Sequence, residues 1–201
     1  MLKDVDEKVT ISDRNSSELD WNGEIGNSLR TPKDPTGELA AELRKYDVEG
    51  IEYKDGNVDF SPVSLYEVEF SDHDNLYYSI GNSIPIGRLE TRQDLNNAIR
   101  DKWQSLAKQQ IIERINNDEA FASELRERTG IDVSTVKSES ALKKELSRVG
   151  LTMHETPDCS RIQFVPTKIH DAFKHAGGTS EMLERQLSGD IHERVARNLK
   201  N

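Results

Sequence analysis

Three of the five histidines lie within residues 151–178, and a glutamate directly follows the first of them. The histidines are His154, His170 and His175, and the glutamate is Glu155. A neutral imidazole is a good ligand for a divalent metal ion and also a general base that titrates near neutral pH. A carboxylate can bind metal or accept a proton, but it is a weaker base unless its pKa is raised. These residue types predict a metal-binding or acid–base site.

The same segment has the pattern of a β-hairpin followed by a helix. Residues 151–155 and 161–165 alternate as two strands, with turn residues between them. Pro166 fits the first turn of a helix, because its fixed φ and missing N–H cost little there. Gly177–Gly178 can end that helix in a left-handed conformation. The sequence therefore predicts a ββα unit whose helix runs through His175.

Two geometric questions follow from this unit. Neighbouring side chains on a strand point to opposite faces, so only one of His154 and Glu155 can face the helix without a bulge. On a helix, His170 and His175 would be about 140° apart around the axis at 100° per residue. Joint ligation by these two histidines therefore requires the helix to loosen near its glycine end, or His175 to reach from the C-terminus.

Simpler explanations apply to the isolated residues. His73 and His192, taken singly, are best interpreted as surface or hydrogen-bonded core histidines. Structural zinc is disfavoured in the hairpin, because the only cysteine, Cys159, lies in the turn and has no CxxC partner. A single cysteine also argues against a disulfide framework.

The hairpin and helix resemble the HNH (His-Me finger, endonuclease VII-like) nuclease domains of bacterial polymorphic toxins, of the WHH or LHE type. The matching elements are Met153–Glu155, Ile162–Pro166, His170 and His175–Gly178. A second block, Ile51–Pro62, is similar to the "eYxDGxPDFSP" element that precedes the core in that family. The two blocks occur in the expected order, and the resemblance covers roughly residues 50–183.

This resemblance implies roles for the four residues of the cluster. In DNase colicins of the same superfamily, the hairpin motif has two adjacent histidines, the first a metal ligand and the second the base, and two more ligands come from the helix. By that register His154 is a ligand, Glu155 takes the base position, and His170 and His175 complete the site. The alternative register makes His154 the base and leaves Glu155 with the metal.

Three further residues gain candidate roles from the same comparison. Gln163 lies near the middle asparagine of the HNH motif, where an amide could orient the base. Arg161 or Lys168 could hold a nonbridging phosphate oxygen, although either could equally be a surface charge. The implied reaction is hydrolysis of a phosphodiester with one divalent ion per site, Mg²⁺, Mn²⁺ or Zn²⁺.

The resemblance also implies a biological role. It predicts a secreted effector domain, used in competition between bacteria, that cuts DNA more readily than RNA in the target-cell cytoplasm and is neutralised by a cognate immunity protein. One alternative is a non-catalytic binding module whose histidines hold a structural ion. Another is a housekeeping HNH endonuclease, but no DNA-reading module is recognisable outside the candidate core.

Composition sets limits on these expectations. A chain of 201 residues, 34% hydrophobic and 32% charged, supports one moderate core or a core with an appended subdomain. No apolar run approaches 18 residues and the N-terminus is acidic and polar, so neither a membrane span nor a cleavable signal peptide is expected. The net charge of −10 argues against nucleic-acid binding, yet residues 141–201 carry +2 and the first 140 residues carry −12.

The expected fold class is α+β, with a ββα-metal core preceded by a small β-hairpin region and a helical segment. Four parts are predicted: a polar, partly disordered lead-in (1–35), a helix with short strands (36–90), a helical segment (91–150), and the nuclease core with C-terminal helices (151–201). Within these parts, helices are expected at 37–46, 91–128, 138–149, 181–187 and 191–199, strands at 51–53, 58–60 and 63–70, and a hairpin turn at 54–57. Asp59 is expected to cap a turn, or alternatively to support the site from behind.

Overall fold

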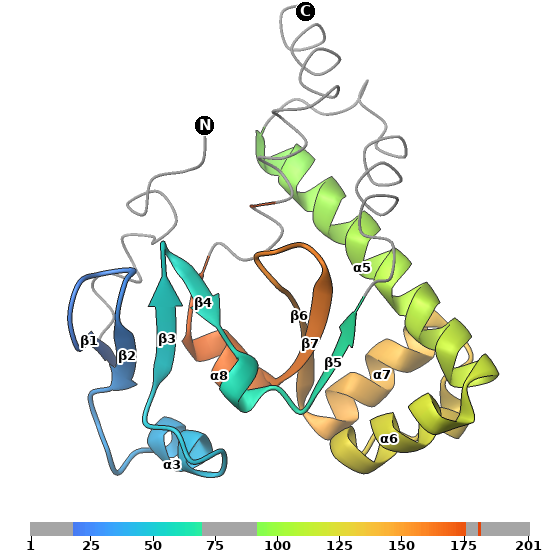
Figure 1. Cartoon of the computed structure of the whole chain (residues 1–201), viewed down its shortest axis with the longest axis horizontal. Coiled ribbons are helices and arrows are strands. Elements are labelled where there is room, and N and C mark those ends of the chain that lie inside the picture. The colour runs from blue at the N-terminus through green and yellow to red at the C-terminus, as the bar shows by residue number, and fades with distance from the viewer. Residues whose placement is uncertain (1–17, 70–91, 176–180, 182–201) are drawn as a thin grey trace, which may run out of the picture.

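The computed structural model describes residues 18–69, 92–175 and Glu181, and it confirms the α+β class. Two antiparallel sheets have strand orders β1-β2-β3-β4 and β5-β7-β6 (Figure 1). The strands are β1 (Leu19–Trp21), β2 (Leu29–Pro32), β3 (Ile51–Lys54), β4 (Asn57–Asp59), β5 (Tyr66–Glu69), β6 (Leu151–Glu155) and β7 (Arg161–Pro166). The helices are α3 (Glu38–Arg44), α5 (Arg92–Asn117), α6 (Glu119–Thr129), α7 (Glu139–Val149) and α8 (Thr167–Ala172), with 3₁₀ turns η1 (Ser61–Val63) and η3 (Val133–Thr135).

The four-stranded sheet includes two strands that the sequence did not predict. The turn between β3 and β4 agrees with prediction: Asp55 and Gly56 both have positive φ, 51° and 74°, as a two-residue hairpin turn requires. In contrast, β1 and β2 lie in the segment expected to be an extended lead-in. They were missed because each is only three or four residues long, and β2 pairs with β3 across two residue pairs, Leu29 with Glu52 and Arg30 with Ile51.

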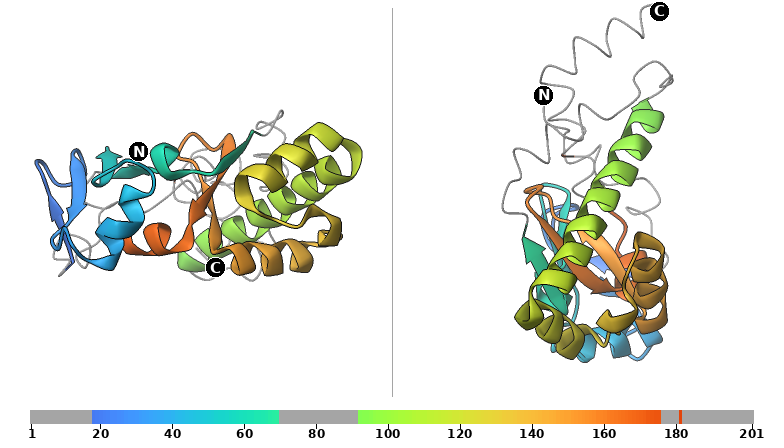
Figure 2. Two further views of the ribbon diagram at one scale, coloured as in Figure 1. Left: turned by 90° about the horizontal axis from the view of Figure 1, so that it is seen from below. Right: turned by 90° about the vertical axis from the view of Figure 1, so that its right-hand side faces the viewer.

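The three-stranded sheet contains the predicted hairpin of β6 and β7. Its two faces pack against different parts of the molecule (Figures 1 and 2). One face, formed by residues such as Met153 and Phe164, packs on a helical layer made by α5, α6 and α7, and we call it the helical face. The other face carries His154 and Val165 and packs toward α8 and the four-stranded sheet, and we call it the site face.

The helical layer largely follows the sequence pattern. The stretch expected to be helical over residues 91–128 is two helices, because Asp118 adopts an extended conformation and its carboxylate accepts a hydrogen bond from Phe121 N at 3.0 Å. Ser138 caps α7 in the same way, accepting from Ala141 N. Gly130 and Gly150 end α6 and α7 in the left-handed region, as expected of helix-terminating glycines.

The helix of the ββα unit is shorter than predicted. The expectation that it runs through His175 is wrong: Pro166 ends β7, and α8 ends at Ala172. Phe173 leaves the helical region (φ −93°, ψ 82°), and its ring is fully buried in the core between α8 and the four-stranded sheet. Burying this ring stabilises the fold more than one further turn of α8 would.

Several expectations fall outside the described residues. They concern the first 17 residues of the lead-in, the isolated histidines His73 and His192, and the helices expected after Gly178. None of the helices in the described part of the chain combines the length and the apolar character that crossing a bilayer requires.

Candidate metal centre

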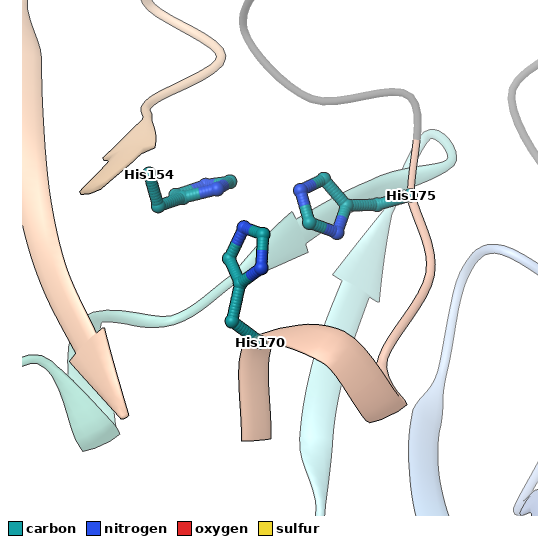
Figure 3. A group of neighbouring side chains, drawn as sticks. All are labelled: His154, His170 and His175. Atoms are coloured by element: carbon teal, nitrogen blue, oxygen red, sulfur yellow. The ribbon is translucent and has the colours of Figure 1, made fainter. Parts of the chain in front are cut away.

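Three histidines from a strand, a helix and the segment after that helix converge on the site face. His154 comes from β6, His170 from α8, and His175 from the segment that follows α8. One ligand nitrogen of each lies within 4.8 Å of the others. The ring centroids are 4.8 to 5.7 Å apart, and Figure 3 shows the three rings turned toward a common point. The three nitrogens are therefore close enough together to bind one ion.

The early end of α8 is what brings His175 to the other two histidines. Because the chain leaves the helix at Phe173, the angle of about 140° that a continuous helix would impose does not apply. Tyr53 Oη donates a hydrogen bond to Lys174 O at 3.0 Å and so ties this segment to β3. His175 Nδ1 donates to Phe173 O at 2.8 Å, which leaves the lone pair of Nε2 available.

Phe60 forms the floor of the cluster and was not singled out by the sequence analysis. Its side chain is 0% exposed, and its ring centroid lies 4.8, 5.6 and 5.3 Å from those of His154, His170 and His175. Asp59 accepts a hydrogen bond from Ser61 N at 2.9 Å, as expected for a residue that caps a turn. The two blocks that resemble the toxin family thus meet in space, and the second block supplies this ring.

Burial favours the neutral form of all three imidazoles. It lowers the pKa of His154 well below its usual value, and the neighbouring His175 and His170 lower it further. Burial likewise lowers the pKa of His175 to about 4 and lowers that of His170, although Asp171 opposes the shift at His170. A neutral imidazole with a free lone pair is the form that binds metal.

One atom of the cluster is left without a partner. His154 is 1% exposed, and its Nε2 has no hydrogen-bond partner among the described residues. A buried polar atom in this state costs free energy, so it usually marks a missing ligand or water. Three neutral imidazole nitrogens fit zinc and other divalent ions of similar preference. The cluster can therefore hold a divalent metal ion.

Glu155 is not part of this cluster. It lies on the helical face, 8% exposed, and its Oε1 accepts a hydrogen bond from Gln104 Nε2 of α5 at 2.8 Å. Burial raises the pKa of its carboxyl group. Adjacent residues on β6 therefore face different layers, as the alternation of a strand requires. Gln104 was not anticipated from the sequence, because nothing local connects it to β6.

The remaining candidate residues lie beside the cluster. Gln163 is paired with His154 across β6 and β7, and its Nε2 donates to Ser61 Oγ (3.0 Å) and to Glu67 Oε2 (2.9 Å). Arg161 is held between two carboxylates, Glu67 and Asp158, each at 2.8 Å.

Lys168 lies on α8, 72% exposed, and its Nζ is 4.0 Å from Glu38 Oε2 of α3. It is two residues before His170, so it projects from the other side of α8. The structure thus gathers the three histidines and separates them from Glu155, Arg161 and Lys168.

Comparison with known protein families identifies a nuclease family over the residues that form this site. Residues 50–177 match the model of the DNase/tRNase domain of colicin-like bacteriocins, a range that includes the Ile51–Pro62 block and all three histidines. The match extends over more than half of the chain, so the protein belongs to this family and is a nuclease toxin domain. No curated protein and no solved structure matches the chain significantly.

Proposed function

We propose that this nuclease domain is a metal-dependent HNH endonuclease of the WHH/LHE type that hydrolyses phosphodiester bonds in DNA. His154, His170 and His175 hold one divalent ion, Mg²⁺, Mn²⁺ or Zn²⁺. The observation that carries the proposal is the convergence of three imidazole nitrogens within 4.8 Å, one of them buried with no hydrogen-bond partner among the described residues. Structural histidines are normally satisfied by hydrogen bonds, so this arrangement favours ligation.

Of the two registers that the sequence left open, the geometry favours His154 as a ligand. The register that pairs Glu155 with the metal requires its carboxylate on the site face, whereas Glu155 is hydrogen-bonded to Gln104 on the helical face. In this proposal Glu155 is a structural residue. Its hydrogen bond to Gln104 anchors the end of β6 to α5 and stabilises the fold without contacting the metal.

A bound divalent ion would activate water and stabilise the charge that develops on the phosphate. The chain's own residues prepare the site for this chemistry. Phe60 excludes water from one side of the imidazoles, and the hydrogen bond from His175 Nδ1 to Phe173 O fixes one ring's tautomer. Gln163 binds Ser61, the residue after Phe60, and so acts as a positioning residue for the floor of the cluster.

DNA is the proposed substrate. DNA lacks the 2′-hydroxyl that can serve as an internal nucleophile in RNA, so its hydrolysis depends on activated water, which is what a metal centre provides. Cleavage of RNA would be a second activity of the family, whose description covers both DNase and tRNase domains.

The biological setting follows from the bacteriocin family. We propose that the domain is a secreted effector used in competition between bacteria, that it acts in the cytoplasm of the target cell, and that a cognate immunity protein neutralises it. We assign the catalytic unit to residues 151–201, the helical segment to 91–150 and the DFSP-type block to 36–90. Residues 1–35 form the lead-in to that block.

Incubation of the purified protein with plasmid DNA and with total RNA tests the proposal. The reactions contain Mg²⁺, Mn²⁺, Zn²⁺ or EDTA, and a parallel set uses His154→Ala. We expect metal-dependent cleavage of DNA that EDTA and the substitution abolish, while circular dichroism shows the variant still folded. Intact DNA and RNA with a folded, metal-loaded protein would instead indicate a structural ion in a binding module.

A further inference from the structure

His175 is the one histidine of the cluster that neither a helix nor a strand holds. The last hydrogen bond of α8 runs from Phe173 N to Ile169 O, so the helical ladder ends two residues before His175. His175 projects from the coil that follows α8 (Figure 3). A ligand on irregular backbone loses conformational freedom when it binds an ion, unless other contacts have already fixed it. The affinity for the metal therefore depends on what holds this coil, residues 173–175.

Two contacts hold the coil in place. The ring of Phe173 is fully buried in the core that also contains Tyr53. Next along the chain, Lys174 O accepts the 3.0 Å hydrogen bond from Tyr53 Oη. Among the described residues, this hydrogen bond is the one that joins the coil to a different element. Because a peptide unit is planar, fixing the Lys174 carbonyl also fixes the amide nitrogen of His175.

The ring of Tyr53 is held in turn by β1 and β2, which lie outside the residues that match the nuclease family. The ring of Trp21 meets it edge to face, with centroids 4.8 Å apart. The guanidinium of Arg30, which is 1% exposed, lies 4.9 Å from the Trp21 centroid and 5.9 Å from the Tyr53 centroid. Tyr53 is 3% exposed, so this packing sets the direction of its hydroxyl group.

The loop between β1 and β2 also holds the backbone of β3 and its turn. The backbone nitrogens of Tyr53 and Gly56 donate to the carbonyl oxygens of Ser28, at 3.2 Å, and of Gly26, at 2.9 Å. No described residue of β1 or β2 belongs to the histidine cluster itself. These strands can therefore influence the metal centre only through the residues that they pack against, and Tyr53 is the one that reaches the coil.

We propose that Tyr53 is a positioning residue for the metal centre and that β1 and β2 hold it in place through Trp21 and Arg30. This inference rests on the proposed function, because it concerns the ion that the three histidines bind. The contacts run from Trp21 through Tyr53 to the Lys174 carbonyl and end at His175. Fixing His175 in advance raises the affinity for the ion and leaves the chemistry of the bound ion unchanged.

The test compares Tyr53→Phe, Trp21→Leu and the matched control Tyr66→Phe. Tyr53→Phe removes only the hydroxyl group and keeps the ring in the core. Tyr66 is also a buried tyrosine, and its hydroxyl donates to Glu124 Oε2 at 3.2 Å, but it lies on the helical face. Three quantities are measured for each variant: the free energy of unfolding in EDTA, the affinity for Zn²⁺ alone, and kcat for DNA cleavage at a series of metal concentrations.

We expect Tyr53→Phe to weaken Zn²⁺ binding by about 10-fold, the lower end of the loss seen for residues that support a ligand. Cleavage by this variant should be slow at low metal concentration and return to the wild-type kcat at saturating metal, because all three ligands remain. Trp21→Leu should show the same pattern with a loss below about 10-fold. Tyr66→Phe should bind Zn²⁺ like the wild type, although it too loses a tyrosine hydrogen bond.

Equal Zn²⁺ affinity in Tyr53→Phe and the wild type would overturn the proposal, as would equal losses in Tyr53→Phe and Tyr66→Phe. A cleavage defect that persists at saturating metal would show that Tyr53 acts on the reaction and not through His175. Wild-type affinity in a folded Trp21→Leu variant would overturn the part assigned to β1 and β2.

The same measurements separate this proposal from the proposed function. If the wild type binds Zn²⁺ but cuts no nucleic acid, hydrolysis fails as the function, and the Zn²⁺ affinities still decide the role of Tyr53. A wild type that binds no Zn²⁺ and cuts nothing with any metal overturns both proposals.

Discussion

His154 and Glu155 are neighbours on β6, yet they meet opposite environments. His154 enters the site face, where its Nε2 has no partner among the described residues and two more imidazoles face it. Glu155 enters the helical face, where Gln104 satisfies one carboxylate oxygen within an otherwise apolar layer. Both residues are almost completely buried, so burial alone does not distinguish them.

The difference lies in whether the buried polar group is satisfied. A satisfied pair such as Glu155 and Gln104 can be retained for structural reasons, whereas an unsatisfied nitrogen in a cluster of like residues implies a ligand from outside the chain. Substitutions on the site face should therefore change metal binding and cleavage. Substitutions on the helical face should change only stability.

The largest effect is expected from removing a ligand. His175→Ala should reduce DNA cleavage by about 1,000-fold or more, because the ion's charge stabilisation is worth several kcal/mol. Its affinity for the metal, measured by isothermal titration calorimetry, should fall by more than about 100-fold, which exceeds the loss typical of residues that only support a ligand. Glu155→Gln is the matched control on the helical face, and a comparable loss of metal affinity there would break the comparison.

The second-largest effect is expected on the stability that metal binding gives to the folded protein. At a metal concentration about 1,000 times Kd, the free energy of unfolding of the wild type should rise by about 4 kcal/mol, because the ion binds only the folded site. Urea denaturation with metal and with EDTA measures this gain. Glu155→Gln should show the same gain, and His175→Ala should show little. An equal gain in His175→Ala would place the ion elsewhere.

The metal-free protein should lose stability in mild acid. Because burial lowers the folded pKa of His175 to about 4, the unfolded chain binds more protons than the folded one between pH 6.5 and 4. The free energy of unfolding should therefore fall as pH drops through this window, by at most about 3 kcal/mol for this residue at 1.4 kcal/mol per pKa unit. Denaturation in EDTA at a series of pH values tests this, and His175→Gln should flatten the profile.

The smallest effect is expected on the helical face. Gln104→Ala should lower the free energy of unfolding by about 1 to 2 kcal/mol, because the buried carboxyl of Glu155 loses its donor. Glu155→Gln, which keeps a polar group of the same shape, should cost less. Metal affinity measured on both variants should equal that of the wild type. A change in affinity without a change in stability would mean that Glu155 acts on the metal centre.

Local sequence patterns predicted the elements around the site well. The alternation of residues 151–155 and 161–165 predicted the hairpin, Ser138 and Gly150 marked the ends of α7, and the turn residues at 54–57 predicted the turn between β3 and β4. Each of these signals depends on residues close together in the chain. The roles assigned to the site residues remain predictions, to be decided by the experiments above.

Long-range packing determined what local patterns could not. The β1 and β2 strands were missed because their stability depends on pairing with β3, and the early end of α8 was missed because it depends on where the ring of Phe173 is buried. Without that early end, His175 would lie on a different side of the helix from His170.

The sequence by itself determined the hairpin, the helix ends, and the presence of three potential ligands in one short unit, because these follow from alternation, capping and residue chemistry. Only the tertiary structure decided which of His154 and Glu155 faces the other histidines, and that Phe60 lies beneath them. The physical reason is that a strand offers two equivalent faces, and the layers packed on each side decide what each face meets.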